Sequence, residues 1–135
     1  MLFRSRLVGT QPVLRIEDVT FHYPSRPNQA ALSSLSLEIR HGQSLALVGP
    51  SGAGKSTVFE LLQRFYDPQE GRISLDGVDI RDIDPGELRQ VMALVPQQPA
   101  LFSNSVAYNI GYGNPEANQD DIERAARAEI GRAHV

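Results

Sequence analysis

Residues 49–57, GPSGAGKST, constrain the fold of this 135-residue chain more than any other segment. They satisfy the spacing G-x-x-x-x-G-K-[ST], in which backbone N–H groups surround a phosphate. The apolar run LALV (45–48) before them predicts a strand buried on both faces. After them, one apolar stripe at helical spacing predicts a helix through Val58, Leu61, Leu62 and Phe65. We therefore expect a strand–loop–helix unit of an α/β protein; an accidental glycine-rich turn is the alternative that this context disfavours.

The residue types of this loop have definite roles in phosphate chemistry. Glycines allow a close backbone approach to the ligand, and the following helix adds its positive N-terminal end. Lys55 supplies a mobile charge for the β- and γ-phosphates, the Ser56 hydroxyl is placed to bind Mg²⁺, and Thr57 is placed to reach the α-phosphate. The predicted nucleotide-binding residues of the loop are Gly49, Pro50, Ser51, Gly52, Ala53, Gly54, Lys55, Ser56 and Thr57.

The flanking segments predict further strands and helices. A strand with a bend near Glu17 and Asp18 is expected within residues 13–23, and the alternating LSLEI (35–39) predicts a half-buried strand antiparallel to a neighbour. Pro68 and Gly71 are expected to end the helix that follows the loop. The remaining expectations are a short strand in RISLDG (72–77), a helix capped by Asp84, a buried strand ALV (93–95) and a helix from about Asn118.

Composition excludes several classes of function. The formal net charge of −3 argues against nucleic-acid binding, which requires a concentrated basic surface. The absence of cysteine excludes disulfides and thiolate metal sites. No apolar run approaches the roughly 20 residues of a membrane-spanning helix. The aspartates of residues 76–84 do not keep the register of a calcium-binding loop and are interpreted as turn and cap residues.

Four segments together resemble the nucleotide-binding domain of ABC transporters, over about residues 13–128. VTFHYPSRP (19–27) resembles the aromatic loop of that family, and LVGPSGAGKST (47–57) resembles its phosphate loop. DPQEGRISLDGVDIRDID (67–84) resembles the stretch after the first core helix. LVPQQPALFSNSVAYNI (94–110) resembles the glutamine-loop region, and its form, like that of the tyrosine segment, is most similar to exporters.

The resemblance implies a fold, partners and further site residues. The fold would be the α/β P-loop NTPase (ABC ATPase) fold, incomplete, with an N-terminal antiparallel β portion. Tyr23 would stack on adenine, Lys55 and Gln97 would be catalytic, and Ser56 and Gln97 would contact Mg²⁺. The cofactors would be ATP and Mg²⁺. The partners would be a transmembrane domain of the same or another chain and a second ABC ATPase domain in a head-to-tail dimer. The parent protein would work at the cytoplasmic face of a membrane.

The chain departs from the family pattern towards its ends. The 135 residues contain no LSGGQ-type signature, no Walker B aspartate with its adjoining catalytic glutamate, and no switch histidine. Residues 1–12 are interpreted as a linker remnant and residues 13–128 as the N-terminal part of the ATPase domain. Residues 129–135, EIGRAHV, break the helical pattern at Gly131 and resemble an in-frame translation of a sequencing adapter; a natural C-terminus is the alternative.

Two functions follow as hypotheses. In the first, the chain is a fragment of the ATP-binding subunit of an ABC exporter, whose parent binds and hydrolyses ATP to drive transport across a membrane. In the second, the chain as written is a nucleotide-binding or inert fragment without ATPase activity. Other phosphate-loop enzymes are disfavoured, because no guanine-reading N-K-x-D motif is present and a small-molecule kinase requires neither Tyr23 nor the Gln97 segment.

Overall fold

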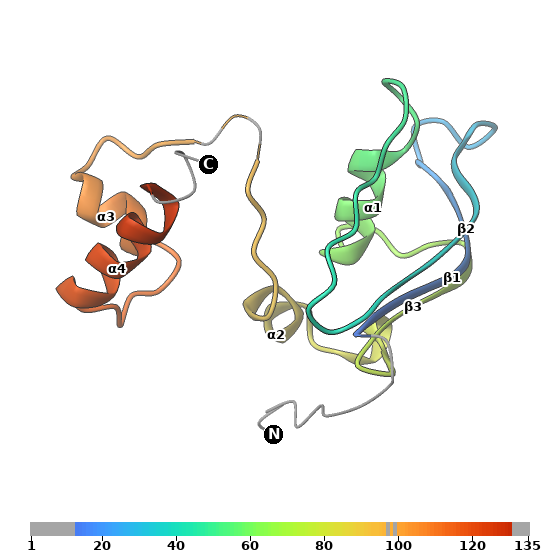
Figure 1. The fold of residues 1–135 in the computed structure, drawn as a ribbon. Coiled ribbons are helices and arrows are strands. Elements are labelled where there is room, and N and C mark those ends of the chain that lie inside the picture. Colours follow the sequence, from blue (N-terminus) through green and yellow to red (C-terminus); the bar gives the residue numbers. More distant parts are fainter. Residues whose placement is uncertain (1–12, 97, 99, 131–135) are drawn as a thin grey trace. The chain divides into compact units, whose positions relative to one another are not determined.

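A computed structural model describes residues 13–96, 98 and 100–130 of the chain, which divides between Ala93 and Leu94 into two units (Figure 1). We describe each unit by itself. The elements of the first unit are β1 (Leu14–His22), β2 (Ala30–Ile39), α1 (Lys55–Leu62), β3 (Glu70–Leu75), β4 (Val78–Asp79), the 3₁₀ turn η1 (Ile80–Asp82) and α2 (Pro85–Gln90). Those of the second are α3 (Val106–Gly111) and α4 (Gln119–Ile130).

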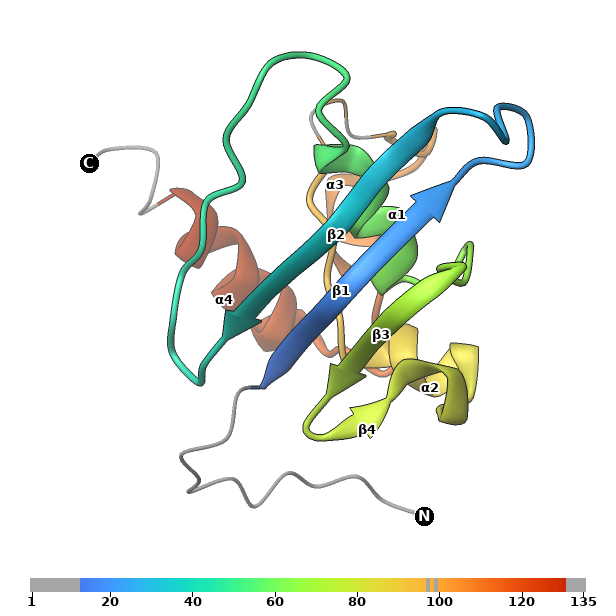
Figure 2. The same cartoon turned by 90° about the vertical axis from the view of Figure 1, so that its right-hand side faces the viewer.

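The first unit is built on an antiparallel sheet with the strand order β2-β1-β3-β4 (Figure 2). The expected antiparallel β portion is therefore confirmed. The predicted bend in β1 is confirmed as well, because the register shifts between Ile16 and Val19 and Asp18 has a φ of 46°. Gly71 of β3 lies against this bend, where a Cβ atom would stand 2.3 Å from the Glu17 carbonyl oxygen. Only a glycine lets the two backbones approach so closely.

Helix α1 packs on one face of this sheet (Figure 2). Its buried Val58 and Leu61 join the apolar side chains of the strands in one core. The predicted apolar stripe is thus confirmed for these two residues, whereas Phe65 lies beyond the helix and is 58% exposed. The buried apolar core comprises Leu14, Ile16, Val19, Phe21, Leu32, Val58, Leu61, Ile73, Ile80 and Leu88.

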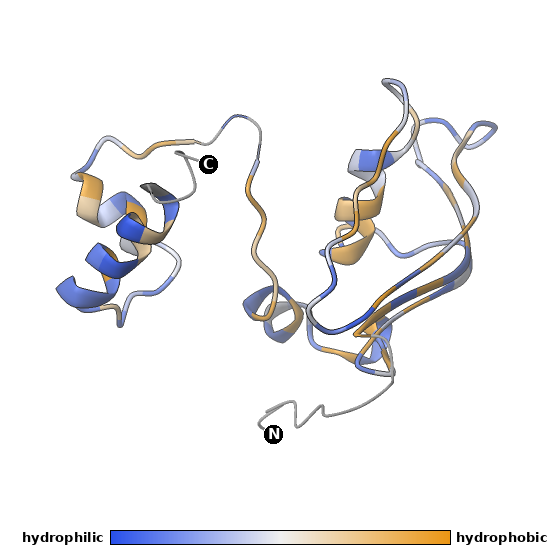
Figure 3. Ribbon diagram, viewed as in Figure 1, coloured by the Kyte–Doolittle hydropathy of each residue, from blue (hydrophilic) through white to orange (hydrophobic). Residues whose placement is uncertain are grey.

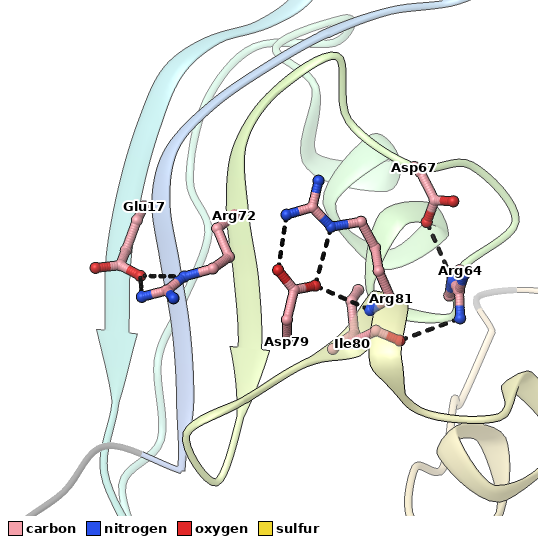
Figure 4. A network of polar contacts seen from close by, with 7 residues as sticks. All are labelled: Glu17, Arg64, Asp67, Arg72, Asp79, Ile80 and Arg81. Carbon is pink, nitrogen blue, oxygen red and sulfur yellow. Dashed lines mark hydrogen bonds and ion pairs between the residues drawn. The ribbon is translucent and has the colours of Figure 1, made fainter.

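Helix α1 ends earlier than its sequence pattern indicates. The prediction that Pro68 and Gly71 end it is wrong, because the last helical residue is Leu62 and Arg64 adopts a φ of 57°. Arg64 then holds the end of the helix against η1. Its guanidinium donates to the Ile80 carbonyl oxygen at 3.2 Å (Figure 4) and to the Ile83 carbonyl oxygen at 2.9 Å. The last carbonyls of α1 itself are met by local backbone bonds, from the Phe65 N–H to Glu60 and from the Arg64 N–H to Leu61, each at 3.0 Å.

Two predicted strands are not formed. Residues 45–48 and 93–95 have no strand structure, and Val48 and Val95 are 89% and 90% exposed. Both apolar segments are orange in Figure 3. A strand is stable only when its N–H and C=O groups pair with a neighbour. Among the described residues neither segment pairs with a strand, and of residues 45–48 Leu47 packs against the core.

Local capping orders the helices. The Asp84 carboxylate accepts from the N–H groups of Gly86 and Glu87 at the start of α2, which confirms the predicted cap. In the second unit, the Asn118 side chain accepts from the Asp121 N–H and confirms the predicted start of α4. Helix α3, which was not predicted, begins at a Ser105 cap. Within the described residues, no helix has both the length and the apolar character needed to cross a membrane.

Candidate nucleotide-binding site

The glycine loop leads directly into α1, as the sequence pattern predicts. Gly54 is the N-cap residue, with a φ of 80° in the left-handed region, and the helix begins at Lys55. A Cβ atom at Gly54 would lie 2.5 Å from the Ala31 carbonyl oxygen and 2.7 Å from a Leu32 methyl carbon. Gly54 is therefore required both for the backbone turn and for docking of the loop on β2.

The first turn of α1 presents uncommitted backbone donors. The first helical hydrogen bond runs from the Val58 N–H to the Gly54 carbonyl oxygen at 3.1 Å, and no side chain caps the helix. The N–H groups of Lys55, Ser56 and Thr57 precede that bond and have no acceptor within the helix. Their orientation and the helix dipole favour an anion at this end.

Lys55 is folded back across the loop. Its ammonium group donates to the carbonyl oxygens of Gly49 and Pro50, each at 2.7 Å. An ammonium has three donors, so one N–H of Lys55 remains for a further acceptor. A positive charge is thereby held against the carbonyl groups of the loop.

Ser56 carries a hydroxyl oxygen, which is a hard oxygen ligand of the kind that Mg²⁺ takes. It is exposed at the first turn of α1. No group of three or more His, Cys, Asp or Glu side chains that could hold a metal ion occurs among the described residues. Mg²⁺ suits such a place, because it keeps several waters and is commonly held by few protein oxygens together with substrate phosphates. The residues present therefore fit an ion that arrives with a nucleotide.

Tyr23 and Thr57, two of the predicted site residues, are brought together. The Tyr23 hydroxyl lies 2.9 Å from Thr57 Oγ1 and donates to Glu60 Oε2 at 2.8 Å. Its ring meets the rings of Phe21 and Tyr66 edge-on, at centroid distances of 5.0 and 5.5 Å. Burial raises the pKa of Tyr23 above its ordinary value; the hydrogen bond from Thr57 opposes this rise and the Glu60 carboxylate adds to it.

Glu60 is a residue of this site that sequence reasoning missed. It lies three residues after Thr57 on α1, so both side chains face Tyr23. The sequence signal that could have pointed to Glu60 is its i, i+3 spacing from Thr57, which places the two polar side chains on one face of the predicted helix. Gln97 lies outside the described residues, and its predicted contact with Mg²⁺ stays a prediction.

A comparison with known proteins places this geometry in a family. The family model described as "ABC transporter" matches residues 32–134. ABC transporter B family member 2 of Dictyostelium discoideum is 49% identical over 115 residues, covering 85% of this chain and 8% of that protein. The mitochondrial potassium channel ATP-binding subunit of Xenopus tropicalis is 51% identical over 120 residues, covering 85% of this chain and 17% of that protein.

A solved structure agrees with these relatives. The structure of a bacterial Atm1-family ABC exporter with ATP bound matches 96% of this chain with a TM-score of 0.81 and 42% sequence identity. This chain corresponds to 23% of that exporter chain, so it spans a minor part of the length of the proteins it matches. The fold is that of the ABC ATPases, and the chain belongs to the ABC transporter family.

Proposed function

We propose that this chain is part of the ATP-binding subunit of an ABC exporter, which binds and hydrolyses ATP to drive transport across a membrane. The observation that carries the proposal is the N-terminal end of α1, where the first three N–H groups have no acceptor within the helix and the Lys55 ammonium is held on the carbonyl oxygens of the glycine loop. A triphosphate is the ligand that this combination of backbone donors, helix dipole and mobile charge suits best. Tyr23 would stack on the adenine.

Each residue contributes binding and positioning. Lys55 would exchange a carbonyl oxygen of the loop for the β- and γ-phosphates and neutralise charge there. Ser56 would hold Mg²⁺, which neutralises phosphate charge when bound, and Gln97 would help to order the metal and the attacking water. The proposed partners are a transmembrane domain and a second ATPase domain arranged head to tail. The proposed location is the cytoplasmic face of a membrane.

For the 135 residues taken alone, we propose nucleotide binding with negligible turnover. No apolar strand ending in paired acidic residues follows the loop in this sequence, so the carboxylate that would polarise the attacking water is not among its residues. The unpaired apolar segments 45–48 and 93–95 favour the same reading, because the sheet that would support them is not formed.

Calorimetric titration of the chain with ATP and Mg²⁺ tests the proposal. We expect saturable binding that Lys55→Ala weakens by at least about tenfold, because it removes a charge-assisted hydrogen bond worth about 1.5–3 kcal/mol. Arg40→Ala, an exposed cation in the turn after β2, is the matched control and is expected to bind like the wild type. Binding that survives Lys55→Ala unchanged would contradict the site, and Lys55-dependent phosphate release would contradict negligible turnover.

A further inference from the structure

Tyr23, Thr57 and Glu60 form a chain of hydroxyl hydrogen bonds between the end of β1 and helix α1. Tyr23 donates to Glu60 Oε2 at 2.8 Å and lies 2.9 Å from Thr57 Oγ1. Thr57 is only 5% exposed, so its hydroxyl is turned into the protein. The rings of Phe21 and Tyr66 hold the tyrosine in this place.

The number of hydroxyl protons fixes which group donates in each of these hydrogen bonds. A tyrosine hydroxyl carries one proton, and Tyr23 uses it to donate the hydrogen bond to Glu60. The bond between Tyr23 and Thr57 must then be donated by Thr57, which also carries a single proton. With that proton committed to Tyr23, the Thr57 hydroxyl has none left to donate to another acceptor. Phosphate oxygens only accept.

Resting on the proposed function, in which Thr57 reaches the α-phosphate, we propose that Glu60 is a positioning residue for nucleotide binding. By accepting the hydrogen bond from Tyr23, Glu60 leaves Thr57 to donate its own hydrogen bond to Tyr23. A nucleotide must break the Thr57–Tyr23 hydrogen bond before Thr57 donates to the α-phosphate. The three side chains thus link Tyr23, the proposed adenine-stacking residue, to the phosphate loop. The cost of breaking their hydrogen bond lowers the affinity for the phosphate part of the ligand.

The variant Tyr23→Phe tests the proposal directly, because it keeps the ring and removes the hydroxyl. The Thr57 proton is then free for the α-phosphate. In calorimetric titrations of the 135-residue chain, we expect the affinity for ADP to rise about two- to tenfold, the range of one neutral hydrogen bond. Adenosine, which has no phosphate, should bind equally well to both proteins. A change in the overall stability of the protein would alter the affinities for ADP and adenosine alike.

Further variants separate this hydrogen-bond relay, in which Thr57 donates to Tyr23 and Tyr23 donates to Glu60, from other effects. In a Thr57→Val background, Tyr23→Phe should no longer raise the affinity for ADP. Glu60→Leu should raise it like Tyr23→Phe, because the tyrosine proton then turns to Thr57. Glu60→Gln removes the charge but keeps an acceptor oxygen, and we expect it to bind ADP like the wild type. An equal gain in Glu60→Gln and Glu60→Leu would assign the effect to charge and overturn the proposal.

A readout without nucleotide completes the test. Tyr23→Phe and Thr57→Val remove the same hydrogen bond, so their effects on thermal unfolding should be less than additive. Additive effects, or unchanged or weaker ADP binding by Tyr23→Phe, overturn the relay. Lys55→Ala distinguishes the proposed function from the relay. If ADP binding depends on Lys55 but Tyr23→Phe does not raise the affinity, the relay fails and the proposed function stands. If ADP binding does not depend on Lys55, the proposed function fails and the relay fails with it.

Discussion

Gly54 shows at the scale of one residue how the phosphate loop depends on its surroundings. Its φ of 80° suits glycine, and a side chain there would also meet the backbone of β2, 2.5 Å from the Ala31 carbonyl oxygen. Gly77, in the turn between β3 and β4, has nearly the same φ of 81° but nothing within 4 Å of an added Cβ atom. A side chain at Gly77 would therefore cause backbone strain alone, whereas a side chain at Gly54 would cause backbone strain and a steric clash.

We expect Gly54→Ala to destabilise the protein more than Gly77→Ala. Left-handed strain alone costs about 1 kcal/mol, which is the whole effect expected at Gly77. At Gly54 the collision with β2 adds to it, for a total of about 2–4 kcal/mol. Urea unfolding of both variants measures the difference. Equal losses would mean that the loop does not dock on β2 as described.

Asp79 and Arg81 show how a charged pair orders a short element. The Arg81 guanidinium donates to Asp79 Oδ2 at 2.7 Å, and the Arg81 N–H donates to Oδ1 at the start of η1 (Figure 4). The hydrogen bond from the Arg81 side chain is the main reason that the pKa of Asp79 lies below its ordinary value of 3.8. The carboxylate is therefore favoured in the folded state.

This pKa predicts the sign of a pH effect on stability. Because the folded pKa of Asp79 is depressed, its stabilisation is fully present above about pH 3.8 and is lost as the pH falls through the lower folded value. Asp79→Asn should be less stable than the wild type at pH 7, and the gap should close in strong acid. Urea midpoints between pH 7 and pH 2 measure this. Asp82→Asn, at an exposed neighbouring carboxylate, is the control; a gap independent of pH would refute the assignment.

Several large apolar side chains are exposed in the described part of the whole molecule. The large apolar side chains that are more than half exposed are Val48, Phe65, Val91, Leu94, Val95, Leu101, Val106 and Tyr112. Several belong to the segments in which the sequence predicts buried strands. Apolar surface of this kind is associated with interaction or aggregation.

We expect the 135-residue chain to self-associate in solution, because burying this apolar surface between molecules is favourable. The double variant Val48→Ser with Val95→Ser should lower the average mass measured by light scattering at equal concentration. Ser103→Ala with Gln98→Ala, at exposed polar positions, should leave it unchanged. A chain that is monomeric without any substitution would contradict this expectation.

Some features were accessible from the sequence because they depend on residues close to one another in the chain. The caps at Asp84 and Asn118 involve groups two or three positions away, and the pattern of the phosphate loop lies in its own residues and the helix that follows. The bend near Asp18 was also visible, because the alternation of apolar residues changes phase there. The family resemblance of residues 13–128 rested on such local motifs.

By itself the sequence determined the phosphate-loop pattern and the helix caps at Asp84 and Asn118, because each arises from contacts within a few residues. Only the tertiary structure decided which apolar runs find partners, where α1 ends and what Tyr23 contacts. Residues 45–48 have strand composition but pair with no strand among the described residues, and Glu60 meets a tyrosine 37 positions away. Such features depend on partners that are distant in the sequence, and a local pattern of residues indicates only that a segment favours burial or pairing.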